Sequence, residues 1–163
     1  MGEVALRAIE DSDLDLLFAM MRDPEAVRMA AFVARDPDDR AAFDAHMAKI
    51  RARDDVTNRV ITLDGRVVGS TAAFVIEGDT EVTYWVDRKY WGRGIAGRAL
   101  AQLLELVSVR PLFGRAASDN AGSIRVLERA GFVRIGTDVG FAEARKAEIE
   151  ETILRLDGRG AGS

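Results

Sequence analysis

The chain has 163 residues, a length that fits one domain with a substantial core, and 48% of its residues are hydrophobic and 31% charged, as in ordinary globular proteins. It contains no cysteine, which excludes disulfides, thiolate metal sites and a cysteine nucleophile. The net charge of −4 disfavours a general nucleic-acid binder, no apolar run approaches the roughly 20 residues that span a bilayer, and the start lacks the pattern of a signal peptide. We therefore expect a cytoplasmic protein that binds neither nucleic acid nor membrane.

The N-terminal third predicts one strand followed by helices. Residues 4–9 alternate as a short strand, and a helix with an apolar stripe follows, capped by Asp11 or Ser12. Pro24 and the pair Asp36-Pro37 each predict the start of another helical segment, because proline suits the first helical position.

From Thr57 the pattern changes to strands rich in β-branched and aromatic residues. Asp64-Gly65 and Gly78-Asp79 are typical hairpin turns, so the three strands between and around them form an antiparallel meander. The predicted strands cover residues 57–63, 67–76 and 81–86.

The C-terminal part alternates helices and strands. A helix is predicted over 96–107, and Pro111 prevents it from continuing into a strand over 112–118. Ser118 or Asn120 caps a second helix, which ends near Gly131. Two strands close the chain, and a disordered tail is expected at the end; these segments are 132–139, 148–157 and 158–163. The order of elements predicts an α+β (mixed α/β) fold in one domain, residues 1–157.

The stretch "YWGRGIAGRAL", residues 90–100, is a glycine-rich entry to a helix. Its glycines match the letters G-x-G-x-x-G, but the loop follows an antiparallel meander rather than the first strand of a parallel unit, which argues against a dinucleotide site. A P-loop is excluded because no Lys-Ser or Lys-Thr pair follows. A plain flexible turn before a helix is the alternative to an anion site.

Helix geometry favours the anion site. The backbone N–H groups from Arg93 to Arg98 are expected to be unpaired in the first helical turn, where the helix dipole also attracts negative charge. Gly94 and Gly97 allow a close approach of the backbone, and the two arginines can add charge-assisted contacts.

Three segments resemble the GNAT acetyltransferase superfamily, and within it the branch of bacterial ribosomal-protein alanine or serine N-terminal acetyltransferases. They are "EVTYWVDRKYWGRGIAGRAL", "SDNAGSIRVLERAGFVRIG" and "LRAIEDSDLDLLFAMMRDPEAV", and the closing "EETILRLD" also fits. Gly94 and Ala96 match the family loop, whereas Trp91 stands where Gln or Arg is usual. The resemblance implies a mixed, mostly antiparallel sheet of six to seven strands flanked by helices, with a V-shaped splay between the fourth and fifth strands.

The resemblance also implies the co-substrate and its site. The family transfers the acetyl group of acetyl-CoA directly to an amine in a ternary complex, without a metal. The pyrophosphate would lie on the loop, the pantetheine arm beside the fourth strand, and the Val86 N–H would polarise the thioester carbonyl. The implied cofactor-binding residues are Trp85, Val86, Asp87, Arg93, Gly94, Ile95, Ala96, Gly97, Arg98 and Asn120.

Glu81 is the candidate base, since the period of a strand places it on one face with Thr83 and Trp85. The alternative base is Glu77 or a chain of water molecules. If Glu81 has no catalytic role, it is simply a solvated carboxylate at the end of a strand. Ser123, in the Asn-x-x-Ser motif, is the candidate proton donor to the departing thiolate. Capping chemistry alone would also explain Asn120 and Ser123.

The sequence does not decide whether the primary amine that accepts the acetyl group is a protein N-terminus, an amino acid or another small amine. It also does not decide between a monomer and a homodimer. The alternative function is a GNAT-fold module that binds acyl-CoA as a sensor or regulator without efficient turnover.

Overall fold

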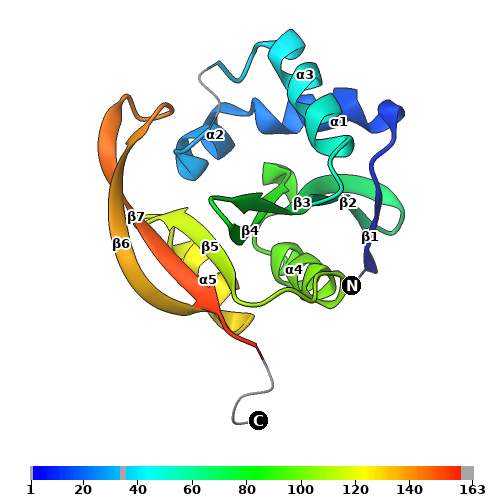
Figure 1. The fold of residues 1–163 in the computed structure, drawn as a ribbon. Coiled ribbons are helices and arrows are strands. Elements are labelled where there is room, and N and C mark those ends of the chain that lie inside the picture. The colour runs from blue at the N-terminus through cyan, green and yellow to red at the C-terminus, as the bar shows by residue number, and fades with distance from the viewer. Residues whose placement is uncertain (1, 34–35, 159–163) are drawn as a thin grey trace.

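The computed structural model describes residues 2–33 and 36–158, and one sheet contains the seven strands found there (Figure 1). The strand order is β1-β2-β3-β4-β5-β7-β6, and every neighbouring pair is antiparallel except β4–β5. The strands are β1 (Val4–Ala8), β2 (Thr57–Leu63), β3 (Arg66–Ile76), β4 (Asp79–Val86), β5 (Leu112–Ala117), β6 (Val133–Ala142) and β7 (Ala147–Leu156). The predicted mixed, mostly antiparallel α+β sheet is confirmed.

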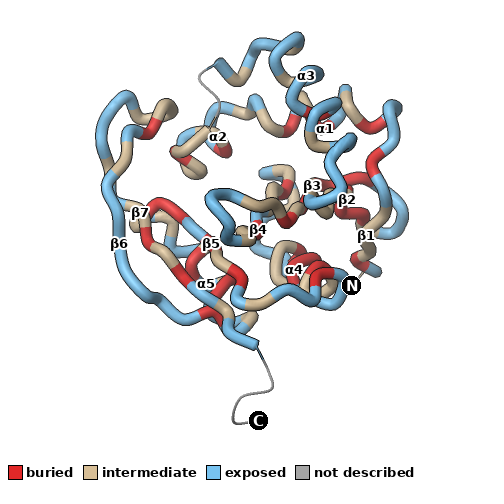
Figure 2. Tube along the Cα trace, viewed as in Figure 1, coloured by how far each residue is buried: buried red, intermediate tan, exposed pale blue. Residues whose placement is uncertain are grey.

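Helices cover both faces of the sheet (Figure 1). They are α1 (Leu14–Met21), α2 (Pro24–Ala30), α3 (Arg40–Arg51), α4 (Ile95–Leu106) and α5 (Ala121–Arg129), with short 3-10 turns η1 (Asp11–Asp13) and η2 (Arg88–Tyr90). Leu17 of α1 and Met47 of α3 pack with Val60 of β2 on one face. Leu103 of α4 and Leu127 of α5 pack with the opposite face. Figure 2 shows that burial concentrates in the central strands and α4, whereas nearly all of β6 is exposed.

Three predicted element boundaries are wrong, each for a local reason. Neither Asp11 nor Ser12 caps α1, because a 3-10 turn comes first and the Asp13 carboxylate accepts from the Glu10 N–H at 2.8 Å. Asp39, not the pair Asp36-Pro37, begins α3, since its carboxylate accepts from the Ala42 N–H.

The third error is in the second hairpin. Its turn consists of Glu77 and Gly78, with φ of 51° and 86°, and Asp79 already begins β4. The first hairpin has the same left-handed pair at Asp64 and Gly65, φ 51° and 82°, as in a type I′ turn. The shift of one residue matters because the turn sets the register between the two strands, in which Ile76 pairs with Asp79 and Phe74 with Glu81.

The ladder between β4 and β5 is short. It joins only Thr80, Glu81 and Val82 of β4 to residues 112–114, although β4 continues to Val86. Four residues of β4 therefore have no strand on that edge, and the predicted splay between the fourth and fifth strands is confirmed.

The predicted boundary of the domain at residue 157 stays a prediction. Apart from Gly158, the predicted tail 158–163 lies outside the described residues.

Gly69 fixes how closely β3 approaches the free end of β4. It pairs with Val86, and a Cβ at this position would overlap the carbonyl group of Trp85, which is backbone and cannot turn away. Only glycine therefore allows this spacing between the two strands.

We expect Gly69→Ala to lower the free energy of unfolding by about 1–3 kcal/mol, as overpacking in a core does. Gly136→Ala is the matched control, because it is an exposed strand glycine whose added Cβ would meet nothing within 4 Å; its effect should stay within about 0.5 kcal/mol. Urea denaturation measures both variants, and equal stabilities would show that β3 and β4 separate without cost.

Candidate functional site

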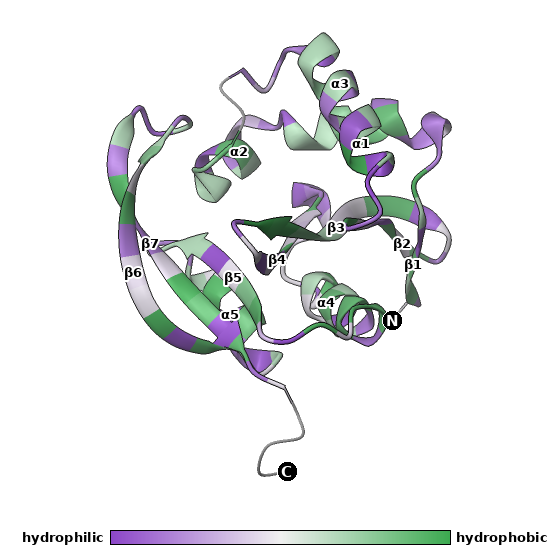
Figure 3. Cartoon of the chain, in the orientation of Figure 1, coloured by the Kyte–Doolittle hydropathy of each residue, from purple (hydrophilic) through white to green (hydrophobic). Residues whose placement is uncertain are grey.

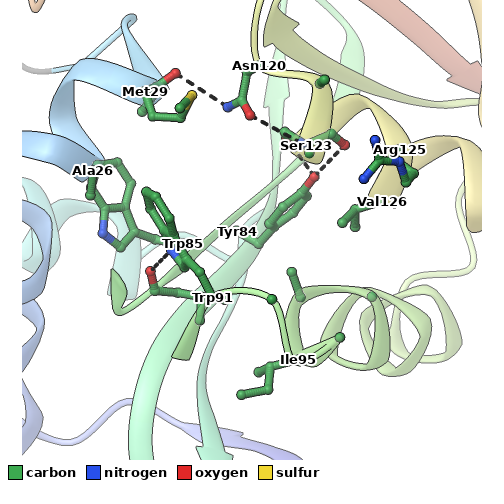
Figure 4. Close-up of a pocket in the computed structure, with 18 of the residues that line it drawn as sticks. Ala26, Met29, Tyr84, Trp85, Trp91, Ile95, Asn120, Ser123, Arg125 and Val126 are labelled. Atoms are coloured by element: carbon green, nitrogen blue, oxygen red, sulfur yellow. Dashed lines mark hydrogen bonds between the residues drawn. The ribbon is translucent and has the colours of Figure 1, made fainter. Parts of the chain in front are cut away.

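A cleft of about 670 Å³ opens where β4 and β5 separate (Figure 4). The end of β4, the N-termini of α4 and α5, and the inner side of α2 form its walls. Eight of the predicted site residues line it: Trp85, Val86, Gly94, Ile95, Ala96, Gly97, Asn120 and Ser123. Four segments of the chain, the first beginning at Ala26 and the last ending at Arg129, thus meet in one place.

The first turn of α4 points free backbone donors into this cleft. Gly94 is the N-cap residue in a left-handed conformation, φ 74°, and no side chain caps the helix. The N–H groups of Ile95, Ala96 and Gly97 therefore have no acceptor within the helix. A Cβ at Gly94 or Gly97 would meet nothing within 4 Å, so space is open in front of these donors. The arrangement suits an anion such as a pyrophosphate.

Arg98 is not one of these donors, which corrects the prediction that its N–H is unpaired. That N–H donates to the Gly94 carbonyl at 3.2 Å, as the first regular bond of the helix, and the guanidinium donates to the Gly2 carbonyl at 2.9 Å. Arg93 also lies outside the cleft wall, with its guanidinium 5.3 Å from the centre of the Tyr90 ring.

Asp87 too uses its polar groups locally and lies outside the cleft wall. Its N–H donates to the Val68 carbonyl at 2.8 Å, and its carboxylate accepts from the Lys89 N–H at 3.1 Å. The backbone positions that remain available to a ligand on β4 are those before Asp87.

The direction of the Val86 N–H follows from the bond that Asp87 makes. Successive residues of an antiparallel strand direct their N–H and C=O groups to opposite edges. Since Asp87 bonds to β3, the N–H groups of Val86 and Tyr84 point away from β3, toward the splay. The Val86 carbonyl on that side accepts from the Trp91 indole at 2.8 Å, which leaves the Val86 N–H as the donor facing the cleft.

Trp91, where the resemblance gave no side-chain role, therefore fixes the glycine loop to the end of β4. Trp85 donates its indole N–H to the Met20 carbonyl at 3.2 Å and so ties β4 to α1. The two indoles thus connect this end of β4 to the glycine loop and to α1, and both line the cleft (Figure 4).

Asn120 caps α5, as the capping alternative predicted. Its side-chain oxygen accepts from the Ser123 N–H at 3.2 Å, and its amide donates to the Met29 carbonyl of α2 at 3.4 Å. The residue therefore joins two walls of the cleft, and the cleft exposes the same side chain to a ligand.

The Ser123 hydroxyl lies 2.7 Å from the hydroxyl of Tyr84, and Tyr84 also lies 3.0 Å from the Ser123 carbonyl as a donor (Figure 4). Burial raises the pKa of Tyr84 to about 12. The sequence could not have predicted this contact, because an aromatic residue in a strand shows no sign of a polar partner 39 positions later.

Two more residues of the cleft wall were missed, Arg125 and Arg129. They lie four positions apart on α5, so they share one face of the helix. The only available signal was this spacing after the Asn-x-x-Ser motif, and exposed arginines with that spacing are common on helices.

Glu81 lies outside the cleft wall, about 13 Å along β4 from Trp85 at the usual rise of a strand. Its carboxylate is 3.5 Å from Arg115 of β5, whose guanidinium also contacts Glu151 of β7 at 3.0 Å and Asp138 of β6 at 3.9 Å. The Glu81 side chain is 14% exposed, and Glu77 stands in the exposed hairpin turn.

The ionisation of Glu81 depends on this group of charges. Burial raises the pKa of Glu81 above its usual value, Arg115 opposes the rise, and Glu151 and Asp79 add to it. A carboxylate with a raised pKa beside a sheet edge has the property that a general base requires.

In the described part of the chain, no three His, Asp or Glu side chains lie together in an arrangement that could hold a metal ion. In the same residues, no helix combines the length and the apolar character that crossing a membrane requires.

A family model described as "Acetyltransferase (GNAT) domain" matches residues 3–133. The chain belongs to the GNAT acetyltransferase family. The match covers the predicted base, the glycine loop and the Asn-x-x-Ser segment, so the predicted superfamily and the class of enzyme, an N-acetyltransferase, are confirmed.

Solved GNAT structures share the whole fold at low sequence identity. RimL, the ribosomal L7/L12 alpha-N-protein acetyltransferase in complex with coenzyme A, has a TM-score of 0.82 and 16% identity over 95% of this chain and 94% of that chain. The ribosomal-protein-alanine N-acetyltransferase from Brucella melitensis has a TM-score of 0.79 and 23% identity, covering 94% and 99%.

The spermidine N-acetyltransferase from Vibrio cholerae, in complex with coenzyme A and spermine, has a TM-score of 0.78 and 14% identity, covering 94% and 95%. Comparison with curated protein sequences found no match. At these identities the structural similarity establishes the fold, and the acceptor must be argued from the site itself.

Proposed function

We propose that the protein is an acetyl-CoA-dependent N-acetyltransferase of the ribosomal-protein N-terminal branch, which transfers the acetyl group directly to a primary amine. The observation that carries the proposal is the position of the uncapped N-terminus of α4 beside the unpaired end of β4. The free N–H groups of Ile95, Ala96 and Gly97 form an anion cradle. Such a cradle next to an open strand edge suits a long ligand that has a phosphate group at one end and amide groups along its length.

The residues of the cleft fit coenzyme A in three parts. Ile95, Ala96 and Gly97 would hold the pyrophosphate with their backbone N–H groups, and the free edge of β4 would pair with the pantetheine amides. Arg125 and Arg129 supply positive charge on the α5 wall, where further phosphate oxygens of the nucleotide would lie. Acetyl-CoA supplies the activated acetyl group as a thioester.

The acceptor amine must lose a proton before or during transfer. Glu81 is proposed to take it through a chain of water molecules, because Glu81 lies about 13 Å along β4 from Trp85. The Val86 N–H polarises the thioester carbonyl, and the Ser123 hydroxyl donates a hydrogen bond to the departing sulfur, whose pKa as a thiol is about 8.5.

Two classes of acceptor follow from the similar structures, protein N-termini and polyamines. The branch resemblance in the sequence favours an N-terminus that begins with alanine or serine. The acidic side chains Glu81, Glu151 and Asp138 surround one arginine on the Trp85 face of the sheet, and this excess of negative charge suits a cationic amine in either class.

A thiol-release assay tests the proposed function. The protein should release free thiol from acetyl-CoA only with an amine present, and peptides that begin with alanine or serine should exceed spermidine in kcat/KM. Binding of coenzyme A by calorimetry without thiol release for any amine of the panel would favour the sensor module instead.

The anion cradle predicts a specific loss in Gly94→Glu. The new carboxylate would stand in the open space before the free N–H groups and repel a pyrophosphate, so the Kd for coenzyme A should rise more than about tenfold. Gly78→Glu is the matched control, since Gly78 has φ 86° and equally open space but lies in the β3–β4 turn.

Both variants force a side chain into a left-handed conformation, which costs about 1–2 kcal/mol of stability. Calorimetric titration separates this shared cost from binding. An unchanged Kd in Gly94→Glu would remove the loop from the proposed cofactor site.

The base assignment predicts opposite shifts of the pH–rate profile. Activity is lost as pH falls through the raised pKa of Glu81, because the protonated carboxyl cannot accept a proton. Arg115→Met removes the cation that lowers this pKa, so the acidic limb moves to higher pH. Glu151→Gln removes an anion that raises it, so the limb moves to lower pH.

Glu81→Gln should abolish that limb and lower kcat/KM by about 10²-fold. Arg53→Met is the matched control for Arg115→Met and should leave the pH–rate profile unchanged. Among the residues that the structure describes, Arg53 pairs only with the exposed Asp55. Shifts in the same direction for Arg115→Met and Glu151→Gln would contradict Glu81 as the base.

A further inference from the structure

Tyr84 has one hydroxyl proton and two acceptors within reach. The Ser123 carbonyl lies at 3.0 Å and the Ser123 hydroxyl oxygen at 2.7 Å, so the proton can serve only one of them fully (Figure 4). The choice decides where the Ser123 proton points, because the short hydroxyl–hydroxyl contact uses a proton from one partner or the other.

In the first arrangement Tyr84 donates to the carbonyl and Ser123 donates to Tyr84. The Ser123 proton is then held in the hydrogen bond to Tyr84, and the Ser123 hydroxyl presents only its lone pairs to the cleft. In the second arrangement Tyr84 donates to the Ser123 hydroxyl oxygen. The Ser123 proton is then free to turn into the cleft, and the Ser123 carbonyl keeps its helical partner, the N–H four residues later in α5.

We propose that Tyr84 is a positioning residue for Ser123: by donating to the serine oxygen, it aims the serine hydroxyl proton at the leaving sulfur. The proposal rests on the proposed acetyl transfer and adds a residue to which neither the resemblance nor the loop motif assigned a role. Donation from Tyr84 also polarises the serine hydroxyl, so the bond from Ser123 to a developing thiolate becomes stronger.

Tyr84 keeps its proton throughout. Burial raises the pKa of Tyr84 to about 12, well above the thiol value of about 8.5, so transfer of its proton to a thiolate is unfavourable. The pair therefore stabilises the leaving thiolate by hydrogen bonding, and the sulfur takes its final proton from solvent. Burial of Tyr84 serves this role, because an ionised tyrosine could not donate.

A double-mutant cycle tests the proposal. Ser123→Ala should lower kcat about 10²-fold, and Tyr84→Phe, which keeps the ring and its packing, should lower kcat about tenfold with the KM for acetyl-CoA within twofold. In the Ser123→Ala background, Tyr84→Phe should have no further effect on kcat, because the hydroxyl that it positions is gone.

Thr71→Val is the matched control. It removes another buried hydroxyl beside β4, one that donates to the Thr83 carbonyl at 2.8 Å and does not line the cleft, so stability should fall while kcat stays unchanged. Ser123→Thr retains a hydroxyl and should recover part of the activity.

The outcomes distinguish a failure of the positioning role of Tyr84 from a failure of the role of Ser123 in the proposed function. Multiplicative losses in the double variant, or an unchanged kcat in Tyr84→Phe, would overturn the role of Tyr84 while leaving Ser123 in place. An unchanged kcat in Ser123→Ala would overturn the hydrogen bond from Ser123 to the departing sulfur, which belongs to the proposed function itself.

Discussion

The chemistry of the cleft depends on one break in backbone hydrogen bonding, the end of the β4–β5 ladder at Val82. Up to that point β4 is bonded on both edges, and beyond it only β3 remains as a partner. Unpaired backbone groups are costly in a dry interior. In this fold the Trp91 indole N–H donates a hydrogen bond to the Val86 carbonyl, and the rest of the unpaired edge faces the open cleft.

Two helix N-termini face this open edge, and they are capped differently. Asn120 closes the first turn of α5 with its own side chain, whereas α4 begins at a glycine without any capping side chain. The Asn120 side chain accepts from the Ser123 N–H in the first turn of α5, whereas no side chain accepts from the first-turn N–H groups of α4. The glycine start of α4 therefore leaves more backbone donors for an anion than the asparagine start of α5 does.

The sequence predicted the elements well because each carries a strong local signal. Hydrophobic period, hairpin glycines and proline positions predict the strands and α-helices of the described chain, and the errors at Asp11 or Ser12, Asp36-Pro37 and Gly78-Asp79 concern boundaries of a few residues. β6 shows the limit of such patterns: Val133, Val139 and Phe141 are more than half exposed, and hydrophobic and hydrophilic bands alternate along it in Figure 3. Burial at an edge strand depends on what packs there, which no local period encodes.

The residues of the candidate site also divide into those that local sequence patterns predict and those that depend on distant contacts. Gly94, Ala96 and Asn120 were predictable, because backbone conformation, small size and capping act within a few residues of the chain. Arg98 was not, since its bond to the Gly2 carbonyl joins positions 96 residues apart. Tyr84 was missed for the same reason, and its polar role depends on α5 reaching back to β4.

The alternation of β4 gives the proposed mechanism its geometry. Tyr84 and Trp85 are neighbours in sequence, so their side chains point to opposite faces of the sheet. Tyr84 meets Ser123 on the face of α5, whereas Trp85 shares the other face with Glu81. The proposed proton acceptor and the proposed stabiliser of the thiolate therefore stand on opposite faces of one strand. Only where the sheet splays can an amine from one face reach a thioester on the other, which is why direct transfer requires the open end of β4.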